Sequence, residues 1–126
     1  MRVMLLEDDD FTRETLKAAL RGSGVDVVHD AQNAKSAIDY SKSNPVDITV
    51  IDYNLGRGPN GIDVSKFLCQ IQPAMSFVLL TGFLNPEIIK SASLALPKGS
   101  SYLLKQDLHD INVLIEKLKQ QFKKPT

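Results

Sequence analysis

The sequence predicts an α/β protein with a doubly wound, five-stranded parallel sheet, a (βα)5 arrangement. Three observations support this fold. Short apolar runs rich in β-branched residues alternate five times with amphipathic stretches. Two of these runs, residues 46–51 and 77–80, are apolar almost throughout, which is typical of parallel strands covered by helices on both faces. The length of 126 residues suits one domain with a core of useful size.

Each predicted strand is a short apolar run bounded by polar or turn-forming residues. In chain order, the predicted strands are residues 2–6, 25–29, 46–52, 75–81 and 101–104. The predicted helices that follow them are residues 11–21, 34–43, 61–71, 86–96 and 108–122.

The predicted helices have physical start and stop signals. Four residues whose side-chain oxygen can accept from a free N–H of the first turn stand at helix starts: Asp10, Asn33, Asn85 and Asp107. Gly22 and Gly24 end the first helix, and Pro45 follows the second. The last helix repeats apolar residues at spacings of three and four, so we expect one of its faces to pack on the sheet.

The composition, with 43% hydrophobic and 24% charged residues, is that of an ordinary globular domain and argues against intrinsic disorder. A single cysteine, Cys69, cannot close an intramolecular disulfide. The 15 Lys+Arg balance the 15 Asp+Glu, so we expect no direct binding to nucleic acid. No apolar run resembles a membrane span or a signal peptide, and we therefore expect a cytoplasmic protein that does not bind membranes.

Reactive side chains follow four of the five predicted strands. In an open parallel sheet, ligands bind beyond the carboxyl ends of the strands, so these positions are the candidate site. Glu7 and Asp8 follow the first strand, Asp52 ends the third, Thr81 ends the fourth and Lys105 follows the fifth. The sequence therefore predicts that these five side chains come together at one edge of the sheet.

The carboxylates of this site predict a divalent cation. Acids that converge from adjacent strands repel one another unless a cation offsets their charge. Glu7, Asp8 and Asp52 form an oxygen-only set of the type that Mg²⁺ prefers, completed by water and a backbone carbonyl. We interpret Asp9 and Asp10 instead as residues that cap the first helix and favour its positive dipole end.

Asp52 is also a candidate nucleophile. A carboxylate beside Mg²⁺ can attack a phosphoryl group if the charge on the phosphoryl oxygens is neutralised. The metal would cover one of these oxygens, the Lys105 ammonium a second and the Thr81 hydroxyl a third. The residue types at these positions therefore indicate phosphoryl transfer.

Over residues 2–122 the chain resembles the receiver domain of two-component response regulators. The segments that carry the resemblance are residues 5–9, 52–55 with 60–61, 80–82 and 99–105, in the order in which the family has them. The resemblance implies the flavodoxin-like strand order 2-1-3-4-5. It also implies a receiver domain over residues 1–122, with 123–126 as a tail or the start of a linker.

The resemblance assigns a role to each site residue. It implies that Asp52 is the phosphoacceptor, that Asp8 binds Mg²⁺ directly and that Glu7 reaches the metal mostly through water. Asn54 would contribute its backbone carbonyl to the metal. Thr81 and Lys105 correspond to the switch hydroxyl and the phosphate-pairing lysine.

The resemblance further implies that a sensor histidine kinase, a phosphotransfer protein or a small phosphodonor phosphorylates the domain. Tyr102 corresponds to the aromatic switch residue, which turns inward as the Thr81 hydroxyl moves to the phosphoryl group. The surface formed by the fourth helix, fifth strand and fifth helix (residues 86–96, 101–104 and 108–122) would then signal to a partner protein, an output domain or a second copy in a phosphorylation-dependent homodimer. The domain would catalyse only its own phosphorylation and dephosphorylation.

The sequence departs from the family pattern in four places. Gln106 replaces the usual cis proline after Lys105, so the loop that holds the lysine departs from the family pattern. The glycine-rich loop of residues 55–61 is longer than usual and lacks its proline after Leu55. The stretch 81–105 is also longer, which affects the course of the predicted helix at residues 86–96. We expect Phe83 to shield the site from water and slow dephosphorylation.

Two other classes of protein use similar residues or the same fold, but their patterns differ from this sequence. A phosphatase of the haloacid-dehalogenase type needs a second Asp two positions after the nucleophile, where this chain has Asn54. A flavodoxin-like cofactor binder needs a phosphate loop where this chain is acidic. Two alternatives stay open: a degenerate receiver that acts only as an interaction module, and a receiver that is part of a longer regulator or hybrid kinase.

Overall fold

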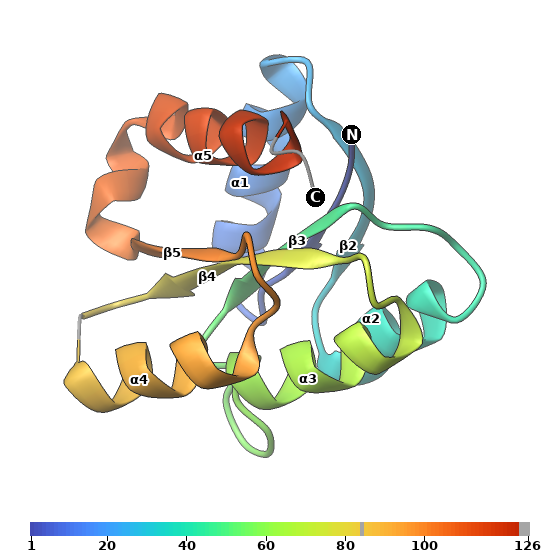
Figure 1. The fold of residues 1–126 in the computed structure, drawn as a ribbon. Coiled ribbons are helices and arrows are strands. Elements are labelled where there is room, and N and C mark those ends of the chain that lie inside the picture. The colour runs from blue at the N-terminus through green and yellow to red at the C-terminus, as the bar shows by residue number, and fades with distance from the viewer. Residues whose placement is uncertain (84, 124–126) are drawn as a thin grey trace.

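The computed structural model describes residues 1–83 and 85–123, which form a five-stranded parallel sheet between two layers of helices (Figure 1). The strand order is β2-β1-β3-β4-β5, so the predicted fold class and strand order are confirmed. The strands are β1 (Arg2–Leu6), β2 (Asp26–Ala31), β3 (Ile48–Asp52), β4 (Ser76–Thr81) and β5 (Ser101–Leu104).

Helices α1 and α5 cover one face of the sheet, and α2, α3 and α4 cover the other (Figure 1). The α-helices are α1 (Asp10–Gly22), α2 (Ala34–Ser41), α3 (Gly61–Ile71), α4 (Pro86–Ala95) and α5 (Ile111–Lys123), and a 3-10 helix, η1 (Lys105–His109), joins β5 to α5. Within the described residues, none of the helices is long and apolar enough to cross a membrane.

Strand alternation divides the core between the two faces. Along β1, Val3 and Leu5 pack with α1 and α5, whereas Met4 and Leu6 pack with the helices of the opposite face. All five residues of β3 are buried, as expected for the central strand of a doubly wound sheet. Full burial of a large apolar side chain stabilises a fold by about 1.5–3 kcal/mol, so the two clusters hold the strand ends in place.

The structure corrects two predicted helix starts. Of the two acids expected to cap the first helix, Asp9 caps α1, because its Oδ2 accepts from the Thr12 N–H at 2.8 Å. Asp10 is instead the first residue of the helix. The prediction that Asp107 caps the last helix is also wrong. Asp107 lies inside η1, and α5 begins only at Ile111. The chain makes a tight 3-10 turn after β5 before the α-helix starts.

The remaining bounds differ from the predicted ones by a few residues. The strand β2 runs to Ala31, two residues beyond its predicted end, because it pairs with the whole of β1. Helix α4 runs from Pro86 to Ala95 in spite of the longer stretch before Lys105. Leu84 and residues 124–126 of the predicted tail lie outside the described residues.

Candidate functional site

Three carboxylates meet at the carboxyl edge of the sheet. One oxygen from each of Glu7, Asp8 and Asp52 lies within 4.8 Å of the others. Glu7 and Asp52 are buried at 1% and 2% exposure, while Asp8 is exposed. The Glu7 N–H donates to the Ala31 carbonyl of β2 at 3.1 Å, which extends the pairing of β1 with β2 by one residue.

Lys105 is the cation that faces these carboxylates. Its Nζ donates to Asp52 Oδ2 at 2.6 Å and lies 3.8 Å from Glu7 Oε1. The backbone at Leu104 is extended, and η1 begins at Lys105. Every peptide bond in the described part of the chain is trans, and Gln106 is accommodated within η1. The missing proline therefore leaves the lysine in contact with the site.

The loop between β3 and α3 lies directly against the carboxylates. The Asn54 N–H donates to Asp52 Oδ1 at 3.1 Å, and the Asn54 side chain accepts from the Gly56 N–H at 3.1 Å. Gly56 has a φ of 82°, and a Cβ there would lie 3.4 Å from Asp8 Oδ2. The loop backbone thus reaches the edge of the acidic cluster, a close approach that suits glycine.

Gly61 sets the distance between α3 and the end of β3. A Cβ at this position would lie 2.3 Å from the carbonyl oxygen of Asp52, which no side chain can occupy. The Gly61 N–H donates to the Tyr53 carbonyl at 2.8 Å. Asn60 caps α3 and forms a capping box with Asp63. These contacts fix the backbone that carries Asp52.

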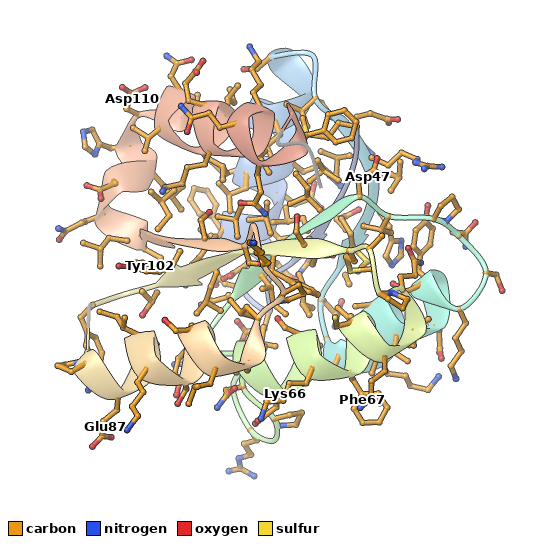
Figure 2. All side chains as sticks on the ribbon, in the orientation of Figure 1. Asp47, Lys66, Phe67, Glu87, Tyr102 and Asp110 are labelled. Atoms are coloured by element: carbon orange, nitrogen blue, oxygen red, sulfur yellow. The ribbon has the colours of Figure 1, made fainter. Side chains whose placement is uncertain are left out.

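Thr81 and Tyr102 occupy the neighbouring strands. Thr81 is buried at 3% exposure and its hydroxyl donates to the Phe83 carbonyl at 2.9 Å. Tyr102 is 41% exposed on β5 and points away from the sheet centre (Figure 2). Phe83 is 64% exposed, so the shielding role expected for it stays a prediction.

Burial and charge shift the pKa values at the site. Desolvation, a hydrogen bond with Asp52 and the charge of Asp52 together raise the pKa of Glu7 to about 8, although the charge of Lys105 acts to lower it. For Lys105, burial alone would lower the pKa, but the hydrogen bond and charge of Asp52 outweigh it and raise the pKa. The lysine is therefore charged, and Glu7 holds a proton near neutral pH unless another cation replaces it.

The donor set fits a hard divalent cation. Glu7 Oε2 is buried and has no hydrogen-bond partner among the described residues. A buried carboxylate oxygen without a donor is costly and needs a proton or a metal ion. All three side chains offer oxygen, the ligand atom that Mg²⁺ prefers.

Arg13 is a residue near the site that the sequence pattern did not single out. Its side chain is 9% exposed, and its Nη1 donates to the Glu7 carbonyl at 2.9 Å. Arg13 shares the buried face of α1 with Leu16 and Leu20. A cation on the apolar stripe of a predicted helix is the signal that would have found it.

The doubly wound parallel sheet has the flavodoxin-like strand order, and an acidic cluster with a paired lysine lies at its carboxyl edge. The chain belongs to the response regulator receiver domain family, which its sequence matches over residues 3–119. It is thus a receiver domain of the two-component systems, and the resemblance in the sequence is confirmed.

Several known proteins and solved structures are similar to this chain. The chain is 33% identical over 90 residues to a cyclic di-GMP phosphodiesterase of Thermotoga maritima, covering 71% of this chain and 23% of the relative. It is 30% identical over 90 residues to the response regulator receiver protein CpdR of Brucella abortus, covering 68% and 73%. A solved LuxR-family response regulator from an Aurantimonas species shares 29% identity and a TM-score of 0.75, covering 93% of this chain and 83% of that one. The chain therefore spans less than a quarter of the phosphodiesterase.

Proposed function

We propose that Asp52 accepts a phosphoryl group in a Mg²⁺-dependent reaction, with a sensor histidine kinase or a phosphotransfer protein as donor. The observation that carries this proposal is the position of Asp52. Its carboxylate is buried at the end of the central strand, 2.6 Å from the Lys105 ammonium and within 4.8 Å of two further carboxylates. An acid so placed has no packing role, and its surroundings suit an anionic reaction.

The metal would be held by Glu7, Asp8 and Asp52, with the backbone carbonyl of Asn54 as a fourth protein ligand. These groups supply only oxygen ligands. The buried Glu7 Oε2, which has no hydrogen-bond partner among the described residues, supports a cation bound between them. When bound, Mg²⁺ would neutralise charge on the phosphoryl oxygens.

The nucleophile is an Asp52 carboxylate oxygen, which forms a bond to phosphorus. The bond between phosphorus and the nitrogen of the donor's phosphohistidine breaks, and its electron pair stays on the imidazole. Lys105 has N–H donors beyond the one that Asp52 accepts, and these pair with a phosphoryl oxygen. The Thr81 hydroxyl, which donates to the Phe83 carbonyl here, turns to another phosphoryl oxygen.

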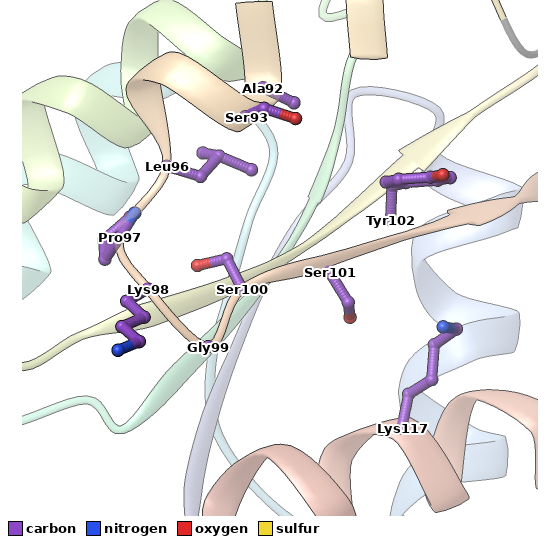
Figure 3. A pocket seen from close by; sticks show the side chains of 10 residues that line it. All are labelled: Ala92, Ser93, Leu96, Pro97, Lys98, Gly99, Ser100, Ser101, Tyr102 and Lys117. Carbon is purple, nitrogen blue, oxygen red and sulfur yellow. The ribbon is translucent and has the colours of Figure 1, made fainter. Parts of the chain in front are cut away.

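The signal leaves the site through Thr81 and Tyr102. Movement of the Thr81 hydroxyl frees space that the outward Tyr102 ring then occupies, which changes the face formed by α4, β5 and α5. A pocket of about 560 Å³ opens on this face, between Ala92 of α4, Tyr102 of β5 and Lys117 of α5 (Figure 3). The pocket supports a role for this face as the contact surface for an output domain, a partner protein or a second copy of the chain.

The test is the intact mass of the protein after incubation with MgCl₂ and acetyl phosphate. We expect the wild type to gain one phosphoryl group, and Asp52→Asn or added EDTA to abolish the gain. Asp39→Asn, which changes an exposed acid of α2 far from the site, is the matched control and should be phosphorylated like the wild type. A folded wild type that gains no mass would favour the phosphorylation-independent interaction module instead.

We extend the proposal to the boundaries of the unit. Residues 1–122 would form the complete receiver, and 123–126 a tail or the start of a linker. A chain that ends at residue 122 should then match the full chain in the mass experiment, and a loss of phosphorylation would contradict these bounds.

A further inference from the structure

Arg13 is a buried cation behind the acidic cluster. It lies on α1 at the position where the inner face of the helix meets the loop after β1. Its side chain is 9% exposed, whereas charged side chains are seldom buried unless they have specific partners. The guanidinium of Arg13 has three such partners, one on each of three neighbouring segments.

The three partners use different nitrogens of the guanidinium. Nη1 donates to the backbone carbonyl of Glu7 at 2.9 Å, and Nη2 donates to Asp10 Oδ1 at 2.6 Å. Nε lies 3.5 Å from Asp30 Oδ2 of β2. The side chain therefore ties the loop after β1 to both α1 and the edge strand.

The bond to Glu7 acts on the peptide group that precedes Asp8. The Glu7 carbonyl and the Asp8 N–H belong to the same rigid plane, so a donor that fixes one fixes the other. The Glu7 N–H is held from the opposite side by the Ala31 carbonyl at 3.1 Å. With both of its backbone polar groups bonded, Glu7 has little freedom to rotate, and the direction in which the Asp8 side chain leaves the loop is set.

We propose that Arg13 is a positioning residue for the divalent-cation site, which orients the Glu7 and Asp8 carboxylates through the Glu7 carbonyl. The inference rests on the proposed function in so far as Mg²⁺ is the ion that these carboxylates hold. Arg13 touches neither the metal nor the phosphoryl group and acts only through the backbone. Asp10 and Asp30 hold the guanidinium in the geometry that this bond needs.

The size of the effect follows from what outer-shell partners contribute elsewhere. Removal of a group that orients a metal ligand typically weakens metal affinity by about 10- to 100-fold. We expect Arg13→Ala to weaken Mg²⁺ binding by about 10-fold, the lower end of this range, because the Ala31 bond still holds the Glu7 N–H. Lysine keeps a charged N–H donor but lacks the planar, forked donor set of a guanidinium. Arg13→Lys should therefore bind Mg²⁺ more tightly than Arg13→Ala and less tightly than the wild type.

Arg21 provides the matched control. It stands on the same helix, and its Nη2 donates to the Val27 carbonyl of β2 at 2.9 Å, toward the other end of the sheet. Arg13→Ala and Arg21→Ala each remove one bond from an α1 arginine to a strand or loop carbonyl. Both should lower the free energy of unfolding in urea, but only Arg13→Ala should weaken Mg²⁺ binding in calorimetric titrations with MgCl₂.

Two results would overturn the inference: Arg13→Ala binding Mg²⁺ as tightly as the wild type, or Arg21→Ala losing as much affinity as Arg13→Ala. If Arg13→Ala does not fold, the comparison of Arg13→Lys with Arg21→Lys carries the same test. The affinity of Arg13→Lys should then fall below that of Arg21→Lys, and equal affinities would contradict the inference.

A second readout does not depend on the metal. In metal-free protein, the amide ¹⁵N resonance of Asp8 should shift in Arg13→Ala and stay in place in Arg21→Ala, because only the first change removes a donor from its peptide plane. If the wild type binds no Mg²⁺ while this shift appears, the metal proposal fails and the positioning role stands. An unmoved Asp8 resonance would refute the positioning role whatever the metal does.

Discussion

The Lys105 Nζ lies 2.6 Å from Asp52 Oδ2 although Gln106, not proline, follows the lysine. The extended backbone at Leu104 and the 3-10 turn that begins at Lys105 are enough to aim the side chain at the acids. The ion pair is partly open to solvent, since the lysine side chain is 35% exposed. The main effect of the ion pair is therefore to offset the charge of two buried carboxylates, and its own contribution to the stability of the fold is smaller.

Lys105→Met should destabilise the metal-free protein by about 1–2 kcal/mol, because a charged hydrogen bond to a buried carboxylate is lost and solvent screens part of its energy. Added MgCl₂ should restore more stability to this variant than to the wild type, since the ion takes over the lost positive charge. Urea unfolding with and without MgCl₂ measures both effects. Lys66→Met, at an exposed position of α3 (Figure 2), is the control and should change neither.

The raised pKa of Glu7 predicts an unusual dependence of stability on pH. The folded-state pKa is about 8 and the ordinary value 4.5, so the metal-free folded protein binds more protons than the unfolded chain between these values. The contribution of Glu7 to stability is full below pH 4.5, declines as the pH rises from there and is lost above about 8. Unfolding measured across this range should show the decline in wild type and not in Glu7→Gln.

The difference between the two pH profiles reports Glu7 together with its change of the Lys105 pKa, because groups outside the site titrate equally in both proteins. Mg²⁺ should reverse the trend: its affinity should rise with pH up to about 8, since the Glu7 proton must leave before the ion can bind. Parallel profiles for wild type and Glu7→Gln, with no change in Mg²⁺ affinity across this range, would show that Glu7 is ionised in the metal-free protein.

Much of the fold was predictable because strand period, helix caps and chain reversals agree along the sequence. Helix α3 has the predicted bounds, Gly61 to Ile71, because Asn60 and Asp63 close its start with a capping box. The predicted start of α5, capped by Asp107, was wrong. Asp107 and Asp110 are both good caps, and the choice between them depends on the 3-10 turn that the chain makes after β5.

The residues that the site brings together were predictable because the strands are parallel and their carboxyl ends share one edge. Arg13 was not predicted because a charged residue in a helix is ordinarily assigned to the solvent face. Its partner atom is a backbone carbonyl, that of Glu7, which carries no mark in the sequence. Tertiary packing decides which backbone atoms a side chain contacts, so such contacts cannot be predicted from the pattern of residue types.

Gly61→Ala should disturb the site from the backbone side. The added Cβ would meet the Asp52 carbonyl, so either α3 or the end of β3 must move, and overpacking of this kind costs about 1–3 kcal/mol. Phosphorylation of Asp52 should slow as well, because the acid moves with its backbone. Gly22→Ala, where a Cβ meets no described atom within 4 Å, is the control and should be neutral or stabilising. Equal urea midpoints for the two variants would contradict this account of Gly61.

The outward position of Tyr102 predicts a spectroscopic signal for the switch. The sequence has 0 tryptophans, so Tyr102→Trp gives a single fluorescent reporter on β5. With MgCl₂ and beryllium fluoride, a mimic of the phosphoryl group, we expect iodide to quench this tryptophan less, because the ring turns inward from its 41% exposed position. Adding Thr81→Ala should abolish the change, because alanine leaves the space open whether or not beryllium fluoride is bound. Tyr40→Trp on α2 is the control, and its quenching should not change. If quenching of the tryptophan at position 102 also stays constant, the ring at this position has no part in the switch.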